Sequence, residues 1–473
     1  MHKNFQNRQD AFFQALGAEK AFDFKKRRLK IGSRQALLVY VIGFTNAYLM
    51  RNVLSSVMAI TNDEIDRAST VSDLMEKHIP FAEAEVVPSA KKAAEEVLRG
   101  SSALLIEGFE DILVFDARMF LLRGPEEPEN DRTLRGPHIG LNESMISNLV
   151  QIRRFLRTGE LESCRFFVGC KAKTEVAVLS VRGRTDPKLM ESVRKRLENA
   201  KTPALSMTQE SLAAILFPQH GLSLLNPFPK VRYTERPDVI AATLMEGKIA
   251  ILCDNTPSAI LLPESVFDFF EEADDYYFPP ITASYLRIVR AFIFLASVFT
   301  IPIWLLLVSM ESSLPDTFSF ILTEGEYSVP LFLQFLIIEI AMDGLKMASL
   351  NTPGTLSGSF SVIGGLLLGE YAVKSGWFVP QTILYSAFSA IANFVPTNYE
   401  LGYSFKFIRM SLILLVEFFG LWGLLGGTAL WVLILASTKS IGGKGYLYPF
   451  FPFHGKGILK ILFRTRKGRE REL

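Results

Sequence analysis

The sequence predicts a cytoplasmic α/β region of two similar subdomains followed by an α-helical polytopic membrane domain. Three observations support this fold class. Charged and apolar residues are mixed as far as Arg290, whereas the stretch from Ala291 to Leu345 contains no lysine or arginine. The first region alternates strand patterns with helix patterns, which is typical of α/β domains. One pattern of a helix followed by a hairpin occurs twice within it.

Length and composition suggest several units. With 473 residues, of which 49% are apolar, the chain is long enough for about three domains. The N-terminus lacks the apolar core of a signal peptide, so we expect the soluble region to be cytoplasmic. We divide the chain into an N-terminal arm (1–34), a first α/β subdomain (35–125), a linker with an amphipathic helix (126–162), a second α/β subdomain (163–286), a transmembrane domain (287–438) and a basic cytoplasmic tail (439–473).

The first subdomain is predicted from a strand, a helix and a hairpin. Gln35 to Ile42 has the β-branched and aromatic content of a buried strand. Ser89 to Leu98 has the spacing of an amphipathic helix, and Gly100 follows it as a typical helix end. The segments 103–106 and 112–115 are apolar and flank a turn, so we expect an antiparallel hairpin.

The second subdomain repeats this order. A strand at 176–181 precedes a helix that Asp186 and Pro187 open. The repeat itself consists of a helix ending at Met245, a strand at 249–252 and a return strand at 259–262. Aligned with the first subdomain, helix, glycine, strand, turn and strand fall in the same order. We therefore expect two structurally similar subdomains.

Between the two repeats lies an amphipathic helix with three arginines, Arg153, Arg154 and Arg157. Such a cluster could hold phosphate or nucleic acid, or it could form salt bridges to a neighbouring subdomain or subunit. No glycine-rich phosphate loop or aromatic platform accompanies it. The pattern therefore favours salt bridges, and we expect no nucleic-acid partner.

The membrane domain begins with Ile288 to Met310, which is long enough for a tilted span. Arg287 and Arg290 lie at its entrance and place the soluble region inside. The tail has nine lysine and arginine residues against two acids, which indicates the same side and contact with membrane lipid. Two cytoplasmic ends require an even number of crossings; we expect four, with six as the alternative. The further apolar segments are 329–342, 359–373, 378–394 and 408–437.

Among the acids in these apolar segments, Glu339 and Glu417 are the candidate intramembrane acids. Ionisable residues inside a membrane are candidates for function, and capping of a helix near the membrane surface is the alternative for Glu339. The last apolar segment is too long for one upright span and too short for two. We expect a break at Gly423, Gly426 or Gly427, which would leave Glu417 at depth as part of a re-entrant pair.

A stripe of small residues marks the segment between Asn351 and Lys374. Positions one helical turn apart are small, so a helix here would carry them on one face. This face could be a tight helix contact or the lining of a narrow pore in an oligomer, and bulkier residues occupy another face. The candidate pore or subunit-contact residues are Ser357, Ser361, Val362, Gly365, Leu366, Gly369, Glu370 and Val373.

Motifs for catalysis and for cofactor binding are absent. The three cysteines, Cys164, Cys170 and Cys253, and the five histidines do not have the spacing of a metal site. No serine nucleophile elbow, phosphate-binding loop or dinucleotide fingerprint occurs. We expect free thiols in a reducing compartment, no catalytic residues, no cofactor, no metal and no enzyme activity.

Residues 235–238 read ERPD, residues 246–251 read EGKIAI and residues 274–277 read DDYY, and Arg287 and Arg290 follow. These strings resemble the A subunits of the GerA-type spore germination receptors, and the match extends from about Leu37 to Lys439. The resemblance implies a homo-oligomer, a pentamer, that forms an ion channel in the spore inner membrane. It also implies an association with germinant receptor complexes, in which a B subunit senses nutrient and a lipoprotein C subunit completes the receptor. The residues that carry the family motif are Arg236, Pro237, Asp238, Gly247, Asp275 and Tyr276.

One string departs from the receptor pattern. Receptor A subunits show a string like ExLREAGxRLP ahead of the glycine-rich helix, whereas residues 342–353 read MDGLKMASLNTP. Together with GW at 376–377, AIANF at 390–394 and ELGY at 400–403, this string resembles a multi-pass relative of the A subunit. That resemblance implies a channel that works alongside the receptors, amplifies the release of monovalent cations and has a different small integral membrane partner. The departure itself argues against direct coupling to a nutrient-sensing B subunit. The alternatives are a nutrient-receptor A subunit with a sensor B subunit and a non-conducting membrane scaffold.

Overall fold

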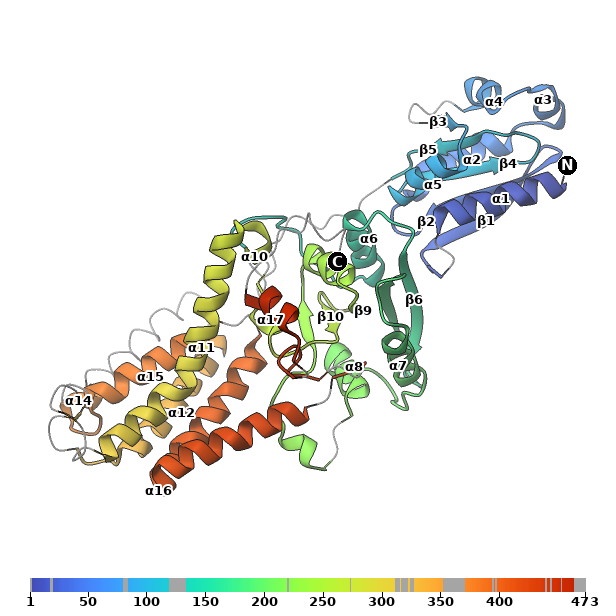
Figure 1. Cartoon of the computed structure of the whole chain (residues 1–473). Coiled ribbons are helices and arrows are strands. Elements are labelled where there is room, and N and C mark those ends of the chain that lie inside the picture. The colour runs from blue at the N-terminus through green and yellow to red at the C-terminus, as the bar shows by residue number, and fades with distance from the viewer. Residues whose placement is uncertain are drawn as a thin grey trace. The chain divides into compact units, whose positions relative to one another are not determined.

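The computed structural model divides the chain into two compact units, residues 1–218 with 231–263 and residues 219–230 with 264–473 (Figure 1). We describe each unit by itself. The residues that the structure describes are 2–17, 20–79, 84–118, 133–218, 221–272, 274–310, 315, 322–323, 327–351, 371–393, 395, 398–438, 440–442, 445–451 and 453–462.

The first unit opens with a five-stranded sheet in the order β1-β2-β4-β5-β3, and all neighbouring strands are antiparallel. The predicted strand at 35–42 is β2, and the predicted hairpin is β4 with β5, so both predictions are confirmed. The strands are β1 (Phe24–Ile31), β2 (Arg34–Val41), β3 (Ala84–Val87), β4 (Ser102–Ile106) and β5 (Ile112–Phe115).

Helices cover both faces of this sheet. Successive strand residues point to opposite faces, so Leu37 and Val39 pack with α1 (His2–Leu16) and α5 (Ala90–Leu98). Leu38, between them, packs on the other face with α2, α3 and α4. The helices of that face are α2 (Ala47–Met58), α3 (Asn62–Arg67) and α4 (Val71–His78). Both faces are buried, which explains the apolar runs in the central strands.

The first subdomain begins earlier than the sequence indicated. The expected N-terminal arm contains α1 and the edge strand β1, which carries the basic run 25–28. All four of these basic residues are exposed, and β1 pairs with β2 along its whole length. Charged side chains on an edge strand hinder pairing with another chain. The basic run therefore lies on a sheet edge.

The second sheet of this unit has the equivalent order, β6-β7-β9-β10-β8, again antiparallel throughout. In the first sheet α5 precedes the hairpin of β4 and β5, and in the second sheet α9 precedes the hairpin of β9 and β10 at the same place in the strand order. The predicted similarity of the two subdomains is therefore confirmed. The elements are α6 (Met145–Phe155), β6 (Leu161–Val168), β7 (Thr174–Val181), α7 (Pro187–Glu198), α8 (Thr208–Leu216), β8 (Arg232–Thr234), α9 (Pro237–Met245), β9 (Ile249–Cys253) and β10 (Ala259–Leu262).

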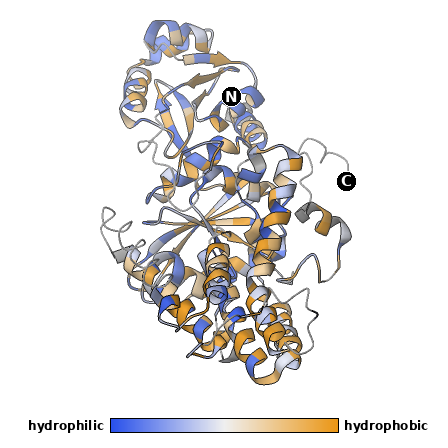
Figure 2. Ribbon diagram, turned by 90° about the vertical axis from the view of Figure 1, so that its left-hand side faces the viewer, coloured by the Kyte–Doolittle hydropathy of each residue, from blue (hydrophilic) through white to orange (hydrophobic). Residues whose placement is uncertain are grey.

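The second unit is helical, and hydrophobic residues dominate its helices (Figure 2). Among the described residues, α11 and α16 are long and apolar enough to cross a membrane, by length and composition. The elements are η1 (Gly221–Leu225), η2 (Asp268–Phe270), α10 (Asp274–Tyr277), α11 (Pro280–Ser309), α12 (Leu331–Asn351), α14 (Ala372–Lys374), α15 (Pro380–Ala392), α16 (Tyr399–Ser437) and α17 (Gly455–Leu462).

The helix α16 folds back on itself as a hairpin. Gly420 has φ 56° and ψ −133°, a conformation that suits glycine and ends the first arm, 399–419. The indole Nε1 of Trp431 donates to Ser411 Oγ at 2.7 Å, which shows that the second arm, 421–437, runs back along the first. The break lies ahead of the glycines that the sequence suggested. Gly423 and Gly427 instead lie where the two arms touch.

Candidate functional site in the helical unit

A cluster of four charged side chains lies between α12 and α16, and we call it the ionic quartet. Glu339 and Asp343 stand one turn apart on α12, and Lys406 and Arg409 stand one turn apart on α16. Glu339, Lys406 and Arg409 are buried, whereas Asp343 is 34% exposed at its side chain. Two acids and two bases balance in charge.

Ion pairs join the members of the quartet across the two helices. Arg409 Nε donates to Glu339 Oε1 at 2.7 Å. The Lys406 ammonium lies 3.1 Å from Glu339 Oε2 and 2.6 Å from Asp343 Oδ2. It also donates to the main-chain carbonyl oxygen of Glu339 at 2.8 Å. Each carboxylate therefore has a basic partner on the opposite helix.

Polar groups extend from the quartet toward two more helices. Arg409 Nη1 donates to the carbonyl oxygen of Ser297 in α11 at 3.2 Å, and Ser389 Oγ of α15 donates to the same oxygen at 3.4 Å. Further along α15, Thr382 Oγ1 donates to Gln334 Oε1 at 3.0 Å. All four helices thus contribute polar groups to the interior of the unit, a place that apolar side chains usually fill.

The two predicted intramembrane acids differ in their surroundings. Glu339 lies in the middle of α12, so it does not cap a helix end. Glu417 is exposed, three residues before the break at Gly420, and no ion pair joins it to the described part of the chain. The sequence contained a signal for the other quartet members, because Asp343 lies four residues after Glu339 and Arg409 lies three residues after Lys406, and both spacings are helical.

Most of the small-residue segment cannot be placed. Ser357, Ser361, Val362, Gly365, Leu366, Gly369 and Glu370 lie outside the described residues. Val373 is half-buried in α14. The two interpretations of the stripe, a tight helix contact and a pore lining, therefore both stay predictions.

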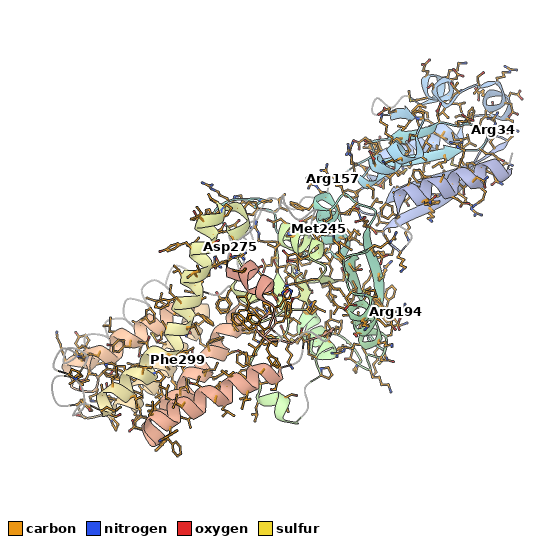
Figure 3. All side chains as sticks on the ribbon, in the orientation of Figure 1. Arg34, Arg157, Arg194, Met245, Asp275 and Phe299 are labelled. Atoms are coloured by element: carbon orange, nitrogen blue, oxygen red, sulfur yellow. The ribbon has the colours of Figure 1, made fainter. Side chains whose placement is uncertain are left out.

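A second buried ionic cluster lies where α11 begins (Figure 3). Asp275 of α10 is fully buried and accepts hydrogen bonds from Arg287 Nε at 3.0 Å and from Arg290 Nη2 at 2.6 Å. Arg287 also lies 3.1 Å from Glu271. These arginines, which the sequence placed at the entrance of the first span, therefore hold the preceding segment. Tyr276 follows in α10.

The remaining family-motif residues belong to the first unit and open and close α9. Pro237 occupies the first helical turn, and the buried Arg236 donates to Asp238 Oδ2 and to Thr133 Oγ1, both at 2.8 Å. Gly247 has φ 88°, and a Cβ there would lie 2.6 Å from a main-chain carbonyl oxygen. These residues fix the helix ends and a linker segment, which is a structural role.

The arginine of α6 that is fully buried joins the two subdomains. Arg153 Nε donates to Asp23 Oδ2 at 2.6 Å, and Ser163 Oγ of β6 donates to Asp23 Oδ1 at 2.6 Å. The guanidinium also lies over the ring of Phe24, 4.7 Å from its centre. The predicted salt bridge to a neighbouring subdomain is therefore confirmed for Arg153.

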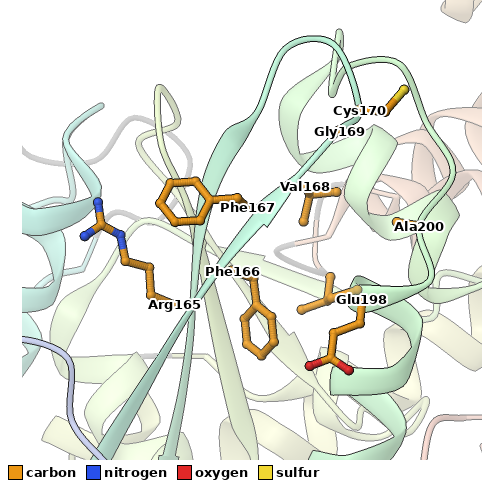
Figure 4. A pocket seen from close by; sticks show the side chains of 9 residues that line it. Arg165, Phe166, Phe167, Val168, Gly169, Cys170, Glu198 and Ala200 are labelled. Carbon is orange, nitrogen blue, oxygen red and sulfur yellow. The ribbon is translucent and has the colours of Figure 1, made fainter.

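A groove of about 450 Å³ lies between β6 and the end of α7 (Figure 4). Its lining includes Arg165, Phe167, Cys170 and Glu198. Phe167 and Cys170 are exposed. The groove carries one free thiol and no cluster of potential metal ligands among the described residues.

The three free cysteines should differ strongly in reactivity. Burial raises the pKa of Cys253 to about 11, and burial also raises the pKa of Cys164, whereas Cys170 is exposed. Because the thiolate is the reactive form, a raised pKa keeps a thiol protonated at pH 8. We expect iodoacetamide at pH 8 to modify Cys170 first, and Cys253 only after unfolding, as followed by peptide mass spectrometry. Equal rates at Cys170 and Cys253 in the folded protein would contradict this assignment.

Comparison with known proteins places the chain in a family. The model of the Bacillus/Clostridium GerA spore germination proteins matches residues 11–472. Stage V sporulation protein AF of Bacillus subtilis is 32% identical over 467 residues, which cover 99% of this chain and 94% of that protein. Spore germination protein KA of Bacillus subtilis is 26% identical, over 93% of this chain and 80% of that protein.

A solved structure also matches. It is the N-terminal domain of the A subunit of the Bacillus megaterium spore germinant receptor GerK3, with 25% identity and a TM-score of 0.40, covering 54% of this chain and 92% of that one. The family match spans nearly the whole chain, and the strings noted in the sequence agree with it. The chain therefore belongs to the GerA family of spore germination proteins and is a germination-related membrane protein.

Proposed function

We propose that the chain is a subunit of an oligomeric ion channel in the spore inner membrane, which releases monovalent cations during germination and amplifies the response of the nutrient receptors. The subunits would form a homo-oligomer, a pentamer by family resemblance, together with a small integral membrane partner. The first unit and the basic tail would lie in the cytoplasm, and the helices would cross the membrane several times.

The ionic quartet carries this proposal. Buried charges in an apolar helical unit cost free energy, and a protein that only needs stable helix contacts could use apolar side chains instead. Here charged and hydroxyl groups of α11, α12, α15 and α16 meet in the interior. Such an interior is typical of proteins that move ions or change conformation in a membrane.

The quartet also suggests how the pore could be controlled. The segment with the small-residue stripe follows α12 directly in the sequence, and the quartet fixes α12 against α16. A rearrangement of these two helices would move the start of that segment. In our mechanism the stripe packs closely between subunits in the closed state and moves apart when the α12–α16 contact changes.

Ion flux tests the proposal. Purified protein reconstituted with its small membrane partner into potassium-loaded liposomes should release potassium, measured with a potassium electrode. Replacing Gly365 by tryptophan should abolish the flux or the assembly, because a large ring cannot fit a stripe of small residues. Gly344, where an added Cβ would meet no atom within 4 Å, is the site for a matched Gly344→Ala control. Absence of flux under every gating condition would favour the scaffold alternative.

A further inference from the structure

The Lys406 ammonium lies in a pocket of oxygen atoms that would suit a free cation. Three oxygens surround its nitrogen: Asp343 Oδ2 at 2.6 Å, the main-chain carbonyl oxygen of Glu339 at 2.8 Å, and Glu339 Oε2 at 3.1 Å. We propose that these oxygens form a monovalent-cation site and that Lys406 is a tethered cation that occupies it. The inference concerns binding and does not depend on channel activity.

The ligand set fits a monovalent ion of the size of ammonium. Potassium and rubidium ions resemble an ammonium group in charge and size, and they take carboxylate and carbonyl oxygens as ligands. The carbonyl oxygen of Glu339 lies in the middle of α12, where carbonyl oxygens accept a hydrogen bond within the helix. It also accepts a hydrogen bond from the Lys406 ammonium, so it faces the position of the cation. The site therefore combines a main-chain dipole with two carboxylates.

The charge balance sets the valence of the ion. Without Lys406, the remaining members of the quartet are Glu339, Asp343 and Arg409, with a formal net charge of −1. A single positive charge restores neutrality, whereas a divalent ion would leave an excess charge in a buried place. Arg409 holds the other oxygen of Glu339 and would keep that carboxylate in position.

Access to the site is through Asp343. The side chain of this residue is 34% exposed, whereas those of Lys406 and Glu339 are buried. An ion entering past Asp343 would exchange its water for protein oxygens one at a time. In K406M, an ion at this place would supply the positive charge that the ammonium supplies in the wild type.

The test removes the tethered charge and supplies an ion in its place. Lys406→Met retains most of the apolar stem and removes the ammonium. Full-length protein in detergent is heated in potassium chloride, in rubidium chloride or in N-methyl-D-glucamine chloride at equal ionic strength. We expect the unfolding midpoint of K406M to rise by about 3 °C or more in potassium or rubidium, because an ion that binds only the folded state stabilises it. The wild-type midpoint should be the same in all three salts.

Two further variants locate the effect. Asp343→Asn combined with Lys406→Met removes one carboxylate and should abolish the dependence on potassium. Lys346→Met is the control, because Lys346 of α12 lies over the rings of Tyr399 and Tyr403 of α16, and its removal should produce no dependence on potassium. Equilibrium binding of radioactive rubidium should give about one ion per K406M chain and none for the wild type.

The possible results divide clearly. A K406M midpoint that is identical in potassium and N-methyl-D-glucamine, with no bound rubidium, would show an ordinary structural ion pair and overturn the proposal. If K406M is recovered folded in potassium chloride alone, the proposal is supported. If K406M is not recovered folded in potassium chloride or in rubidium chloride, the proposal fails, because either ion should replace the ammonium.

Discussion

Glu339→Ala is expected to destabilise the helical unit by about 3–5 kcal/mol, the usual cost of leaving a buried charge without its partner. Arg409, which is fully buried, would lose the carboxylate that its Nε and Nη2 approach at 2.7 Å. Lys406 would keep Asp343 as a partner, so the unpaired charge of Arg409 accounts for most of the lost stability. Thermal unfolding of purified protein in detergent, followed by circular dichroism, measures the change.

The matched control is Glu417→Ala. Glu417 is also an acid within an apolar helix, but it is exposed and has no ion-pair partner in the described part of the chain. Its removal should change the midpoint little, as is usual for exposed side chains. A second check removes both charges: Glu339→Leu with Arg409→Met should recover most of the stability, because an apolar pair leaves no charge unpaired. Equal effects of the two single alanine variants would contradict the role of the quartet.

The sequence predicted central strands well and edge strands poorly, for a physical reason. β2, β4 and β9 are buried on both faces, so their sequences are continuous apolar runs that stand out. The edge strand β1 reads FKKRRLKI, and charge on an edge resembles a flexible basic arm. β6 at the edge of the second sheet mixes Glu, Ser, Cys and Arg with phenylalanine. Neither has the alternation that identifies a strand.

The ionic quartet could not be predicted from one segment of the chain at a time. Hydropathy identified both Glu339 and Glu417 as acids within apolar segments. Their difference depends on which residues of another helix face them. Lys406 and Arg409 lie 67 and 70 positions away from Glu339, and only the packing of α12 on α16 brings them together.

The hairpin of α16 gives a graded prediction at three glycines that the sequence could not distinguish. A Cβ at Gly423 would lie 1.9 Å from the carbonyl oxygen of Leu415 on the first arm, and main-chain atoms cannot move aside without separating the arms. A Cβ at Gly427 would lie 2.7 Å from the flexible ends of two leucine side chains. A Cβ at Gly426 would have no atom within 4 Å. Steric cost should therefore decrease from 423 to 427 to 426.

Alanine at each position should reproduce this order in the free energy of unfolding. Gly423→Ala should cost about 1–3 kcal/mol or more, as overpacking does, and should weaken the hydrogen bond from Trp431 to Ser411 by moving the second arm. Gly426→Ala should be neutral or stabilise by up to about 1 kcal/mol, because alanine favours helix more than glycine does. Unfolding midpoints of the three variants in detergent measure the order. If Gly426→Ala destabilised the protein as much as Gly423→Ala, helix flexibility rather than contact between the arms would be the reason for these glycines.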